Sequence, residues 1–252
     1  YCDLVNGGSI EFGEKINFVV PTGNFGNILA AYFAKEMGLP VNRLICASNA
    51  NNVLTDFIET GVYDRNRKFV TTVSPSMDIL ISSNLERLLY LLCGRDSDVI
   101  NTWFSSLKET GRYEVSDDVK AKIKAVFSAG FCDDVKTKAA IKETYEKYSY
   151  LSDTHTGVAL CVYNEYENKT GDKTKTVIAS TASPFKFSAA VLDALGKKAD
   201  SDDEFSTLSA LEEYTGEKAP ESLAALKGKK VRFGDVIDKS EMADAVFKML
   251  GI

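Results

Sequence analysis

The segment that most restricts the fold is residues 21–27, Pro-Thr-Gly-Asn-Phe-Gly-Asn, which joins an apolar run to a stretch with helical spacing. The run before it, at 16–20, is short and apolar, as in a parallel strand buried on both faces. The stretch after it, at 28–37, ends at Gly38 with Pro40 just beyond, which is how helices commonly stop. A strand that passes through a glycine-containing loop into a helix predicts the start of a parallel α/β sheet.

The same alternation continues along the chain. The sequence predicts a strand at 44–47, a helix capped by Asn51 or Asn52 that ends near Gly61, and another strand at 69–73. Further helices are predicted at 84–93, 99–107, 116–127, 134–148 and 156–168. They are followed by a strand at 176–180 and by helices at 186–195, 204–214, 220–226 and 239–250. The expected fold class is α/β, a partial open parallel sheet flanked by helices, with additional helices toward the C-terminus. Right-handed crossovers would place the strand-to-helix loops on one sheet edge, where such folds bind ligands.

Composition argues against several classes of function. The net charge of −6 disfavours nucleic acid as a partner, and the longest apolar runs fall far below the roughly 20 residues of a membrane span. The five cysteines are irregularly spaced without a C-x-x-C pair, and His155 is the one histidine, so neither a disulfide framework nor a metal site is expected. Because no signal peptide opens the sequence, we expect a cytoplasmic protein.

The loop at 21–27 itself predicts an anion site. Gly23 and Gly26 allow backbone angles that other residues avoid and let amides approach an anion closely, and the following helix points its positive end at the same spot. No lysine follows the second glycine, which excludes a P-loop, and the G-x-x-G spacing departs from the dinucleotide pattern. A small phosphate monoester is therefore the expected ligand. A tight turn with an asparagine cap is the alternative, and two glycines alone would favour it.

The loop resembles the Pro-[Ser/Thr]-Gly-Asn-Phe-Gly-[Asp/Asn] segment of threonine synthase, a family of fold-type II enzymes that use pyridoxal phosphate. Four further segments resemble that family in the same order, at 46–52, 74–79, 152–159 and 180–187. They read Cys-Ala-Ser-Asn-Ala-Asn-Asn, Ser-Pro-Ser-Met-Asp-Ile, Ser-Asp-Thr-His-Thr-Gly-Val-Ala and Ser-Thr-Ala-Ser-Pro-Phe-Lys-Phe. Ordered matches over about residues 17–190 are far more specific than any single motif.

The resemblance implies the tryptophan synthase beta-like fold and the conversion of O-phospho-L-homoserine and water to L-threonine and phosphate, the last step of threonine biosynthesis. It implies that residues 1–196 are the C-terminal portion of the large domain that binds pyridoxal phosphate. Residues 197–252, which open with a polar, acidic stretch up to residue 204, would be a helical extension packed on the same domain. The expected partner is the small-molecule substrate, with no nucleic acid and no membrane.

The resemblance also implies site residues. The cofactor phosphate would be bound by Gly23, Asn24, Phe25, Gly26 and Asn27. Thr181 would offer its hydroxyl to the pyridine nitrogen, where a neutral group does not enforce ring protonation. The candidates for contacts with the substrate are Ser76, Asp78, His155 and Lys186.

Most of these assignments have a structural alternative. Thr181 is equally suited to cap the helix that follows it. Ser76 and Asp78 are equally suited to cap the next helix along the chain. A lone histidine such as His155 is more often structural than catalytic, and Lys186 is a candidate for an ordinary solvated lysine.

Departures from the family pattern have consequences of their own. Ser183 stands where the family has histidine and Thr154 where it has proline, which affects the substrate contacts and not the fold. The family's cofactor-bearing lysine lies upstream of the glycine loop in a Phe-Lys-Asp motif, whereas Lys15 alone precedes the loop here and matches nothing. Because the first residue is also Tyr1 and not methionine, we expect a C-terminal portion of a longer enzyme. Such a portion would contain no catalytic residue, would not turn over substrate alone, and would self-associate through exposed sheet edges.

Three other functions remain open on the sequence. Another fold-type II lyase, such as a threonine dehydratase or a cysteine synthase relative, would share the cofactor site. A threonine synthase-like protein would bind a phosphorylated ligand without a reaction. A bare phosphate-binding structural module is the third. Release of phosphate from O-phospho-L-homoserine would distinguish threonine synthase from the first alternative. The presence of the upstream lysine would distinguish it from the second.

Overall fold

The computed structural model describes residues 1–198 and 203–252, so the predicted loop at 197–204 lies largely outside the described residues. The described chain divides into two compact units, Tyr1–Lys218 and Ala219–Ile252. The division comes after α10 (Glu204–Thr215), which packs on α9 (Ser188–Ala194) with Leu208 and Leu211 buried. The packing of a C-terminal extension on the large domain stays a prediction.

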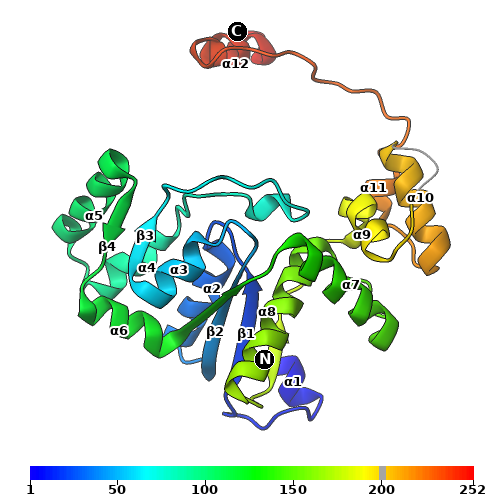
Figure 1. The fold of residues 1–252 in the computed structure, drawn as a ribbon. Coiled ribbons are helices and arrows are strands. Elements are labelled where there is room, and N and C mark those ends of the chain that lie inside the picture. The colour runs from blue at the N-terminus through cyan, green and yellow to red at the C-terminus, as the bar shows by residue number, and fades with distance from the viewer. Residues whose placement is uncertain (199–202) are drawn as a thin grey trace. The chain divides into compact units, whose positions relative to one another are not determined.

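The centre of the first unit is a parallel sheet, which confirms the expected α/β class (Figure 1). In the described residues its four strands run in the order β5-β2-β1-β6 and all neighbours are parallel. The strands are β1 (Ile16–Pro21), β2 (Val41–Ser48), β5 (Phe127–Phe131) and β6 (Thr176–Ile178). A separate antiparallel pair is formed by β3 (Val62–Asp64) and β4 (Arg112–Glu114).

Helices cover both faces of the sheet. The helices and 3₁₀ turns of the first unit, besides α9 and α10, are α1 (Cys2–Asn6), α2 (Gly26–Glu36), α3 (Val53–Thr60), η1 (Pro75–Met77), α4 (Leu85–Leu92), α5 (Ser97–Thr110), α6 (Asp117–Val126), α7 (Asp134–Tyr148), α8 (Thr154–Thr170) and η2 (Pro184–Phe187). Side chains of α2 to α6 form one apolar core and those of α7 and α8 form another.

The strands are apolar at nearly every position because they feed both cores. Val20 and Cys46 belong to the core under α2 to α6, whereas their neighbours Val19 and Ile45 belong to the core under α8. Successive side chains of a strand point to opposite faces, so a strand covered on both sides must be apolar throughout. This is the physical origin of the continuous apolar run that precedes the glycine loop.

The segment at 69–73 and the strand β5 differ from the sequence-based prediction. The predicted strand at 69–73 is a loop, with Phe69 half exposed at 50%. Its backbone pairs with a side chain, since Asn51 donates from Nδ2 to the Val70 carbonyl and accepts from the Val70 N–H. The strand β5 was missed because Ser128, Ala129 and Gly130 carry little strand propensity.

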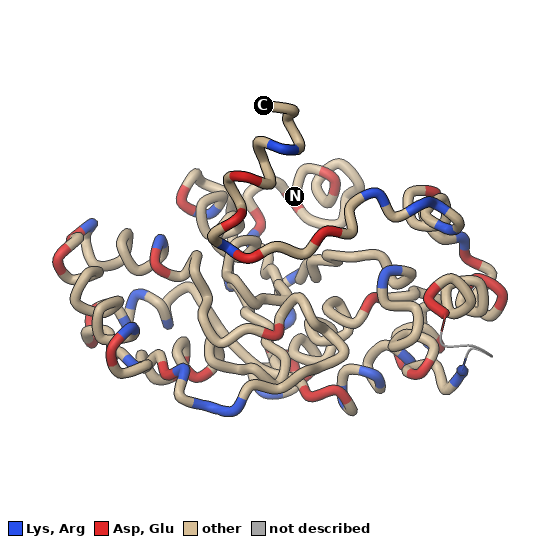
Figure 2. The backbone as a smooth tube through the Cα atoms, turned by 90° about the horizontal axis from the view of Figure 1, so that it is seen from above, with Lys and Arg blue, Asp and Glu red and all other residues tan. Residues whose placement is uncertain are grey.

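The second unit contains α11 (Glu221–Ala224), η3 (Lys239–Glu241) and α12 (Met242–Leu250). Between α11 and η3, residues 229–238 contain no helix or strand and are exposed. Lys and Arg are interspersed with Asp and Glu along the described chain (Figure 2). None of the helices in the described ranges is long and apolar enough to cross a membrane.

Candidate cofactor site

The glycine loop lies where β1 ends and α2 begins, at the carboxyl edge of the parallel sheet. Its first residue is fixed to the neighbouring strand, since the Thr22 N–H donates to the Ala47 carbonyl at 2.8 Å. The Thr22 hydroxyl donates to the Val20 carbonyl at 2.7 Å. The loop therefore leaves the sheet in one defined direction.

The left-handed residue of this loop is Phe25, with φ at 63°, and not one of the two glycines. The sequence-based reason given for Gly23 and Gly26, unusual backbone angles, was therefore wrong. A left-handed conformation costs a non-glycine residue about 1–2 kcal/mol. Burial holds Phe25 there, because its ring is 1% exposed and lies 5.7 Å from the ring of Phe127.

Gly23 is required for a different reason, which is close packing. A Cβ added to Gly23 would lie 3.0 Å from the Met77 Cα and 3.1 Å from the Ser76 carbonyl oxygen, both in η1. Gly26 has room by comparison, because its Cβ would meet the Asn84 side chain at 3.4 Å. The loop is thus pressed against η1 at Gly23 and open at Gly26.

The exposed side of this loop has the chemistry of an anion site. Within the described residues no side chain caps α2, and Gly26 and Asn27 at its start are exposed. Their backbone N–H groups and the positive end of the helix favour a phosphate. Asn24 directs its side-chain oxygen to Ser83, whose N–H and hydroxyl each donate at 2.7 Å, so Asn24 offers an anion only its amide nitrogens.

Asp78 is engaged in a network that holds the loop after β2. Its carboxylate accepts from Asn49 Nδ2 at 2.8 Å, Asn51 Nδ2 at 3.0 Å, and both the hydroxyl and the N–H of Thr72. It does not cap a helix, so that alternative is wrong for Asp78. Its role in this structure is to position the segment around η1 next to the glycine loop.

His155 connects that segment to α8. Its Nε2 accepts from the Ser76 N–H at 3.2 Å, and its Nδ1 lies 2.9 Å from Asp153 Oδ1. Asp153 also caps α8 and accepts from the Thr156 hydroxyl. Burial raises the pKa of the Asp153 carboxyl, but the donors on His155 and Thr156 outweigh this and lower it below the usual value. The imidazole is 4% exposed, so it is a buried bridge.

The loop after β6 brings the remaining candidates to the same edge. Ser180 connects to α8, since its Oγ lies 3.5 Å from the hydroxyl oxygen of Thr156. Thr181 follows and is exposed; the helix-capping role is taken by Ser183, which accepts from the Phe185 N–H at 3.3 Å. Thr181 therefore does not cap the helix that follows it.

Lys186 is exposed, which agrees with the alternative that it is an ordinary solvated lysine. It nevertheless lies beside the bridge formed by His155. Its Nζ sits 5.5 Å from the centroid of the Phe187 ring, and that ring lies 4.7 Å from the imidazole of His155. Ser76 keeps its side chain exposed in η1 while its N–H is used by His155. The structure thus gathers Ser76, His155 and Lys186 in one neighbourhood.

Sequence reasoning missed the residues that position this edge. Asp153 and Asn49 were not singled out, although an aspartate directly before a helix and an asparagine directly after a strand are recognisable signals. Among the described residues, the buried hydroxyls of Ser48 and Ser152 have no hydrogen-bond partner. Ser48 ends β2 and Ser152 precedes Asp153, so both orphaned groups belong to elements that build this edge.

These features fit a phosphorylated cofactor. At Gly23 a Cβ would be tightly packed against the backbone of η1, the exposed amides of the loop are uncapped, and polar groups follow β1, β2 and β6. The described residues contain no cluster of histidine, cysteine and acidic side chains that could hold a metal ion.

Comparison with known proteins finds similarity to threonine synthase proteins. The family model described as "Threonine synthase, C-terminal" matches residues 156–246. The human protein named "Threonine synthase-like 1" is 45% identical over 77% of this chain and 26% of its own length. A crystal structure of yeast threonine synthase superposes with a TM-score of 0.79 at 35% identity, covering 94% of this chain and 48% of that one.

A crystal structure of threonine synthase from Brucella melitensis, which its title describes as PLP bound, superposes with a TM-score of 0.71 at 36% identity. It covers 82% of this chain and 47% of the other. The chain thus spans less than half the length of each of these three relatives, at 26%, 48% and 47%. The glycine loop, the ordered motifs and the parallel sheet therefore agree with a chain that is similar to part of threonine synthase proteins and whose residues 156–246 match the family's C-terminal model.

Proposed function

We propose that this chain forms the phosphate-binding part of a pyridoxal phosphate site in a lyase that converts O-phospho-L-homoserine to L-threonine. The observation that carries the proposal is the cradle at Gly23, where a Cβ would lie only 3.0 Å from the backbone of η1, next to the uncapped start of α2. The bound cofactor would supply an electron sink for carbanion chemistry at the substrate.

The chain's own residues would bind and orient. The N–H groups of Gly26 and Asn27 would hold the phosphate, and Thr181 would donate or accept at the pyridine nitrogen. Asp78 and His155 act as positioning residues, because their polar atoms are occupied by neighbouring loops. Lys186 and the exposed hydroxyl of Ser76 are the groups free to meet the substrate's phosphate.

The lysine that attaches the cofactor covalently would come from outside the 252 residues. Lys15 is a poor substitute because it lies just before the first residue of β1, whereas the glycine loop begins after the last residue of β1. A strand of 6 residues spans about 20 Å, so Lys15 lies at the opposite edge of the sheet. We therefore propose that the 252-residue chain binds pyridoxal phosphate without turning over substrate.

Binding measurements on the purified chain test the phosphate site. We expect pyridoxal phosphate to bind more tightly than pyridoxal, and Gly23→Ala to remove that difference. The loss should be about tenfold or more, comparable to one charge-assisted hydrogen bond. Gly234→Ala is the matched control, because a Cβ there meets nothing within 4 Å. Equal affinity for the two compounds would exclude the loop as the phosphate site.

Two further measurements separate the alternatives. Borohydride reduction should not fix the cofactor stoichiometrically on one lysine of this chain; a single reduced lysine would show that the chain carries its own attachment site. Phosphate release from O-phospho-L-homoserine by the longer polypeptide distinguishes a synthase from a protein that binds a phosphorylated ligand without a reaction. The second candidate has support, since the human relative at 45% identity is named threonine synthase-like.

A further inference from the structure

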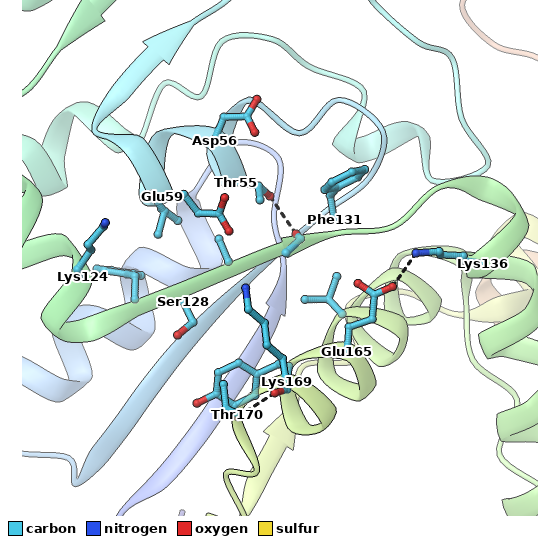
Figure 3. Close-up of a pocket in the computed structure, with 16 residues that line it drawn as sticks. Thr55, Asp56, Glu59, Lys124, Ser128, Phe131, Lys136, Glu165, Lys169 and Thr170 are labelled. Atoms are coloured by element: carbon cyan, nitrogen blue, oxygen red, sulfur yellow. Dashed lines mark hydrogen bonds and ion pairs between the residues drawn. The ribbon is translucent and has the colours of Figure 1, made fainter.

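A hollow of about 670 Å³ runs along the outer side of β5, away from the loops described above. Its walls come from α3 and from α8, and β5 forms its floor (Figure 3). Within the described residues β5 pairs only with β2, so its other side is an open sheet edge. The hollow is therefore a groove with an unused row of backbone donors and acceptors.

The register identifies which backbone groups are open. The Cys132 N–H donates to the Ser48 carbonyl of β2, and alternate residues of a parallel strand face the same neighbour. Ser128 and Gly130 therefore face β2 as well. The N–H and C=O groups of Phe127, Ala129 and Phe131 face outward into the groove.

The two walls carry opposite free charges. On the α3 side, Glu59 is exposed and forms no ion pair among the described residues, and on the α8 side the same holds for Lys169. Figure 3 shows Glu59 on one side of β5 and the amine of Lys169 directed at the strand from the other.

The other charged groups of the groove mostly neutralise one another. Asp56 is paired with Arg67 at 2.8 Å, and Glu165 with Lys136 at 2.7 Å. Lys124 stands at the end of the groove where β5 begins. The groove thus has a carboxylate without an ion pair on α3 and an amine without an ion pair on α8, with the further amine of Lys124 where β5 begins.

The side chains of an added strand would contact the two walls of the groove alternately. Side chains of β5 already alternate in this way: a Cβ on Gly130 would lie 2.9 Å from Val162 of α8, whereas Phe127 belongs to the core under α3. Successive side chains of a strand lying beside β5 would likewise point alternately to α3 and to α8. Charge complementarity then requires basic residues toward α3 and acidic residues toward α8.

We propose that this groove binds an extended segment of a partner protein, about five to six residues long, in which basic and acidic side chains alternate. The segment would add a strand to the sheet at β5, with backbone hydrogen bonds giving affinity and the two walls giving specificity. A second copy of the chain fits less well, because each β5 lies between its own α3 and α8 and like-charged walls would face each other across a two-fold axis.

The test uses a fluorescent peptide with the sequence Thr-Lys-Glu-Lys-Glu-Thr, blocked at both ends. We expect saturable binding to the 252-residue chain, measured by fluorescence anisotropy. The peptide Thr-Lys-Lys-Glu-Glu-Thr, of the same composition, should bind at least about tenfold more weakly because its charges do not alternate. Equal binding of the two peptides would overturn the proposal.

Variants of the walls and floor locate the binding. Glu59→Lys and Lys169→Glu each give both walls the same sign, so a one-residue slip of the peptide cannot restore complementarity, and each should weaken binding. Glu213→Lys and Lys218→Glu, exposed charges outside the groove, are the matched controls. Ala129→Pro removes an outward N–H and should abolish binding. Circular dichroism and urea unfolding verify that each variant is folded.

Two results would contradict the assignment directly. Binding that survives both wall reversals in a folded protein would place the peptide elsewhere. A concentration-dependent dimer in sedimentation, lost in Ala129→Pro, would show that a second copy occupies the groove. Because the cofactor loop plays no part in peptide binding, failure here leaves the proposed function untouched.

Discussion

At the scale of single residues, His155 shows how a functional-looking side chain acquires its role from its contacts. Its Nε2 accepts a hydrogen bond from the Ser76 N–H, so that nitrogen carries no proton. The proton therefore resides on Nδ1 and points at Asp153. The imidazole is neutral and holds η1 against the start of α8, beside the glycine loop.

A first prediction follows for this histidine. Long-range ¹H–¹⁵N NMR spectra at neutral pH should show a protonated Nδ1 and an unprotonated Nε2. His155→Gln should weaken pyridoxal phosphate binding, because η1 then loses its anchor near Gly23, while the chain remains folded. A spectrum with the proton on Nε2 would contradict the bridge.

A second prediction concerns Phe25, which is both buried and left-handed. Phe25→Ala should destabilise the first unit by about 3–5 kcal/mol. Phe25→Gly loses the same ring but relieves the backbone, so it should be more stable than the alanine variant by about 1 kcal/mol. Urea unfolding of the two variants measures the difference, and an alanine variant as stable as the glycine variant would argue against strain at this position.

At the scale of elements, α7 and α8 approach closely at a glycine of α8. A Cβ on Gly157 would lie 2.7 Å from Ile141 Cγ1 of α7, and Ile141 is fully buried. Overpacking costs about 1–3 kcal/mol, while alanine in a helix regains about 1 kcal/mol over glycine. Gly157→Ala should thus lower the free energy of unfolding by about 1 kcal/mol in denaturant titrations. Gly234→Ala should change it by less than about 0.5 kcal/mol.

The opposite edge of the sheet is held by a carboxylate whose stabilisation depends on pH. Burial raises the pKa of Asp172, but donors at Thr174, Tyr166 and Asn17 outweigh this and hold it well below the usual range. Because the folded pKa lies below the value of about 3.9 in an unfolded chain, the charged form stabilises the fold above that pH. The stabilisation is lost as the pH falls through the folded pKa.

Comparison with a neutral variant tests this dependence. Asp172→Asn should have a lower Tm than the parent at pH 6, and the gap should narrow by pH 3. A gap that stays constant between these pH values would show that the charge of Asp172 does not contribute to the stability.

At the scale of the whole molecule, the described chain divides into two compact units between Lys218 and Ala219. Residues 229–238 are exposed and contain no helix or strand, which is where proteases cut first. Limited trypsin digestion should cleave at Lys229, Lys230 or Arg232 before any site in the first unit. A chain that ends at Lys218 should still unfold cooperatively, and a gradual loss of signal would mean that residues 1–218 are not a folding unit.

Much of the sheet and its helices could be predicted from sequence because the deciding forces are local. The apolar run of β1 and the capping serine of α6 determine those elements within a few residues. The segment at 69–73 and β5 show the limit of this approach. Phe69 and Val70 have strand propensity but lie in a loop, whereas Ser128 to Gly130 have little and form a strand beside β2.

The candidate site divides in the same way. The sequence by itself determined the glycine loop, the order of the motifs and hence the resemblance to threonine synthase, because these depend on residue types at short spacing. Only the tertiary structure decided that Phe25 and not a glycine is left-handed, and that Gly23 is required by contact with η1. It alone showed that Ser76 and His155, 79 positions apart, share a hydrogen bond. Such contacts arise where chain segments meet after folding, and no local pattern records which segment will be the neighbour.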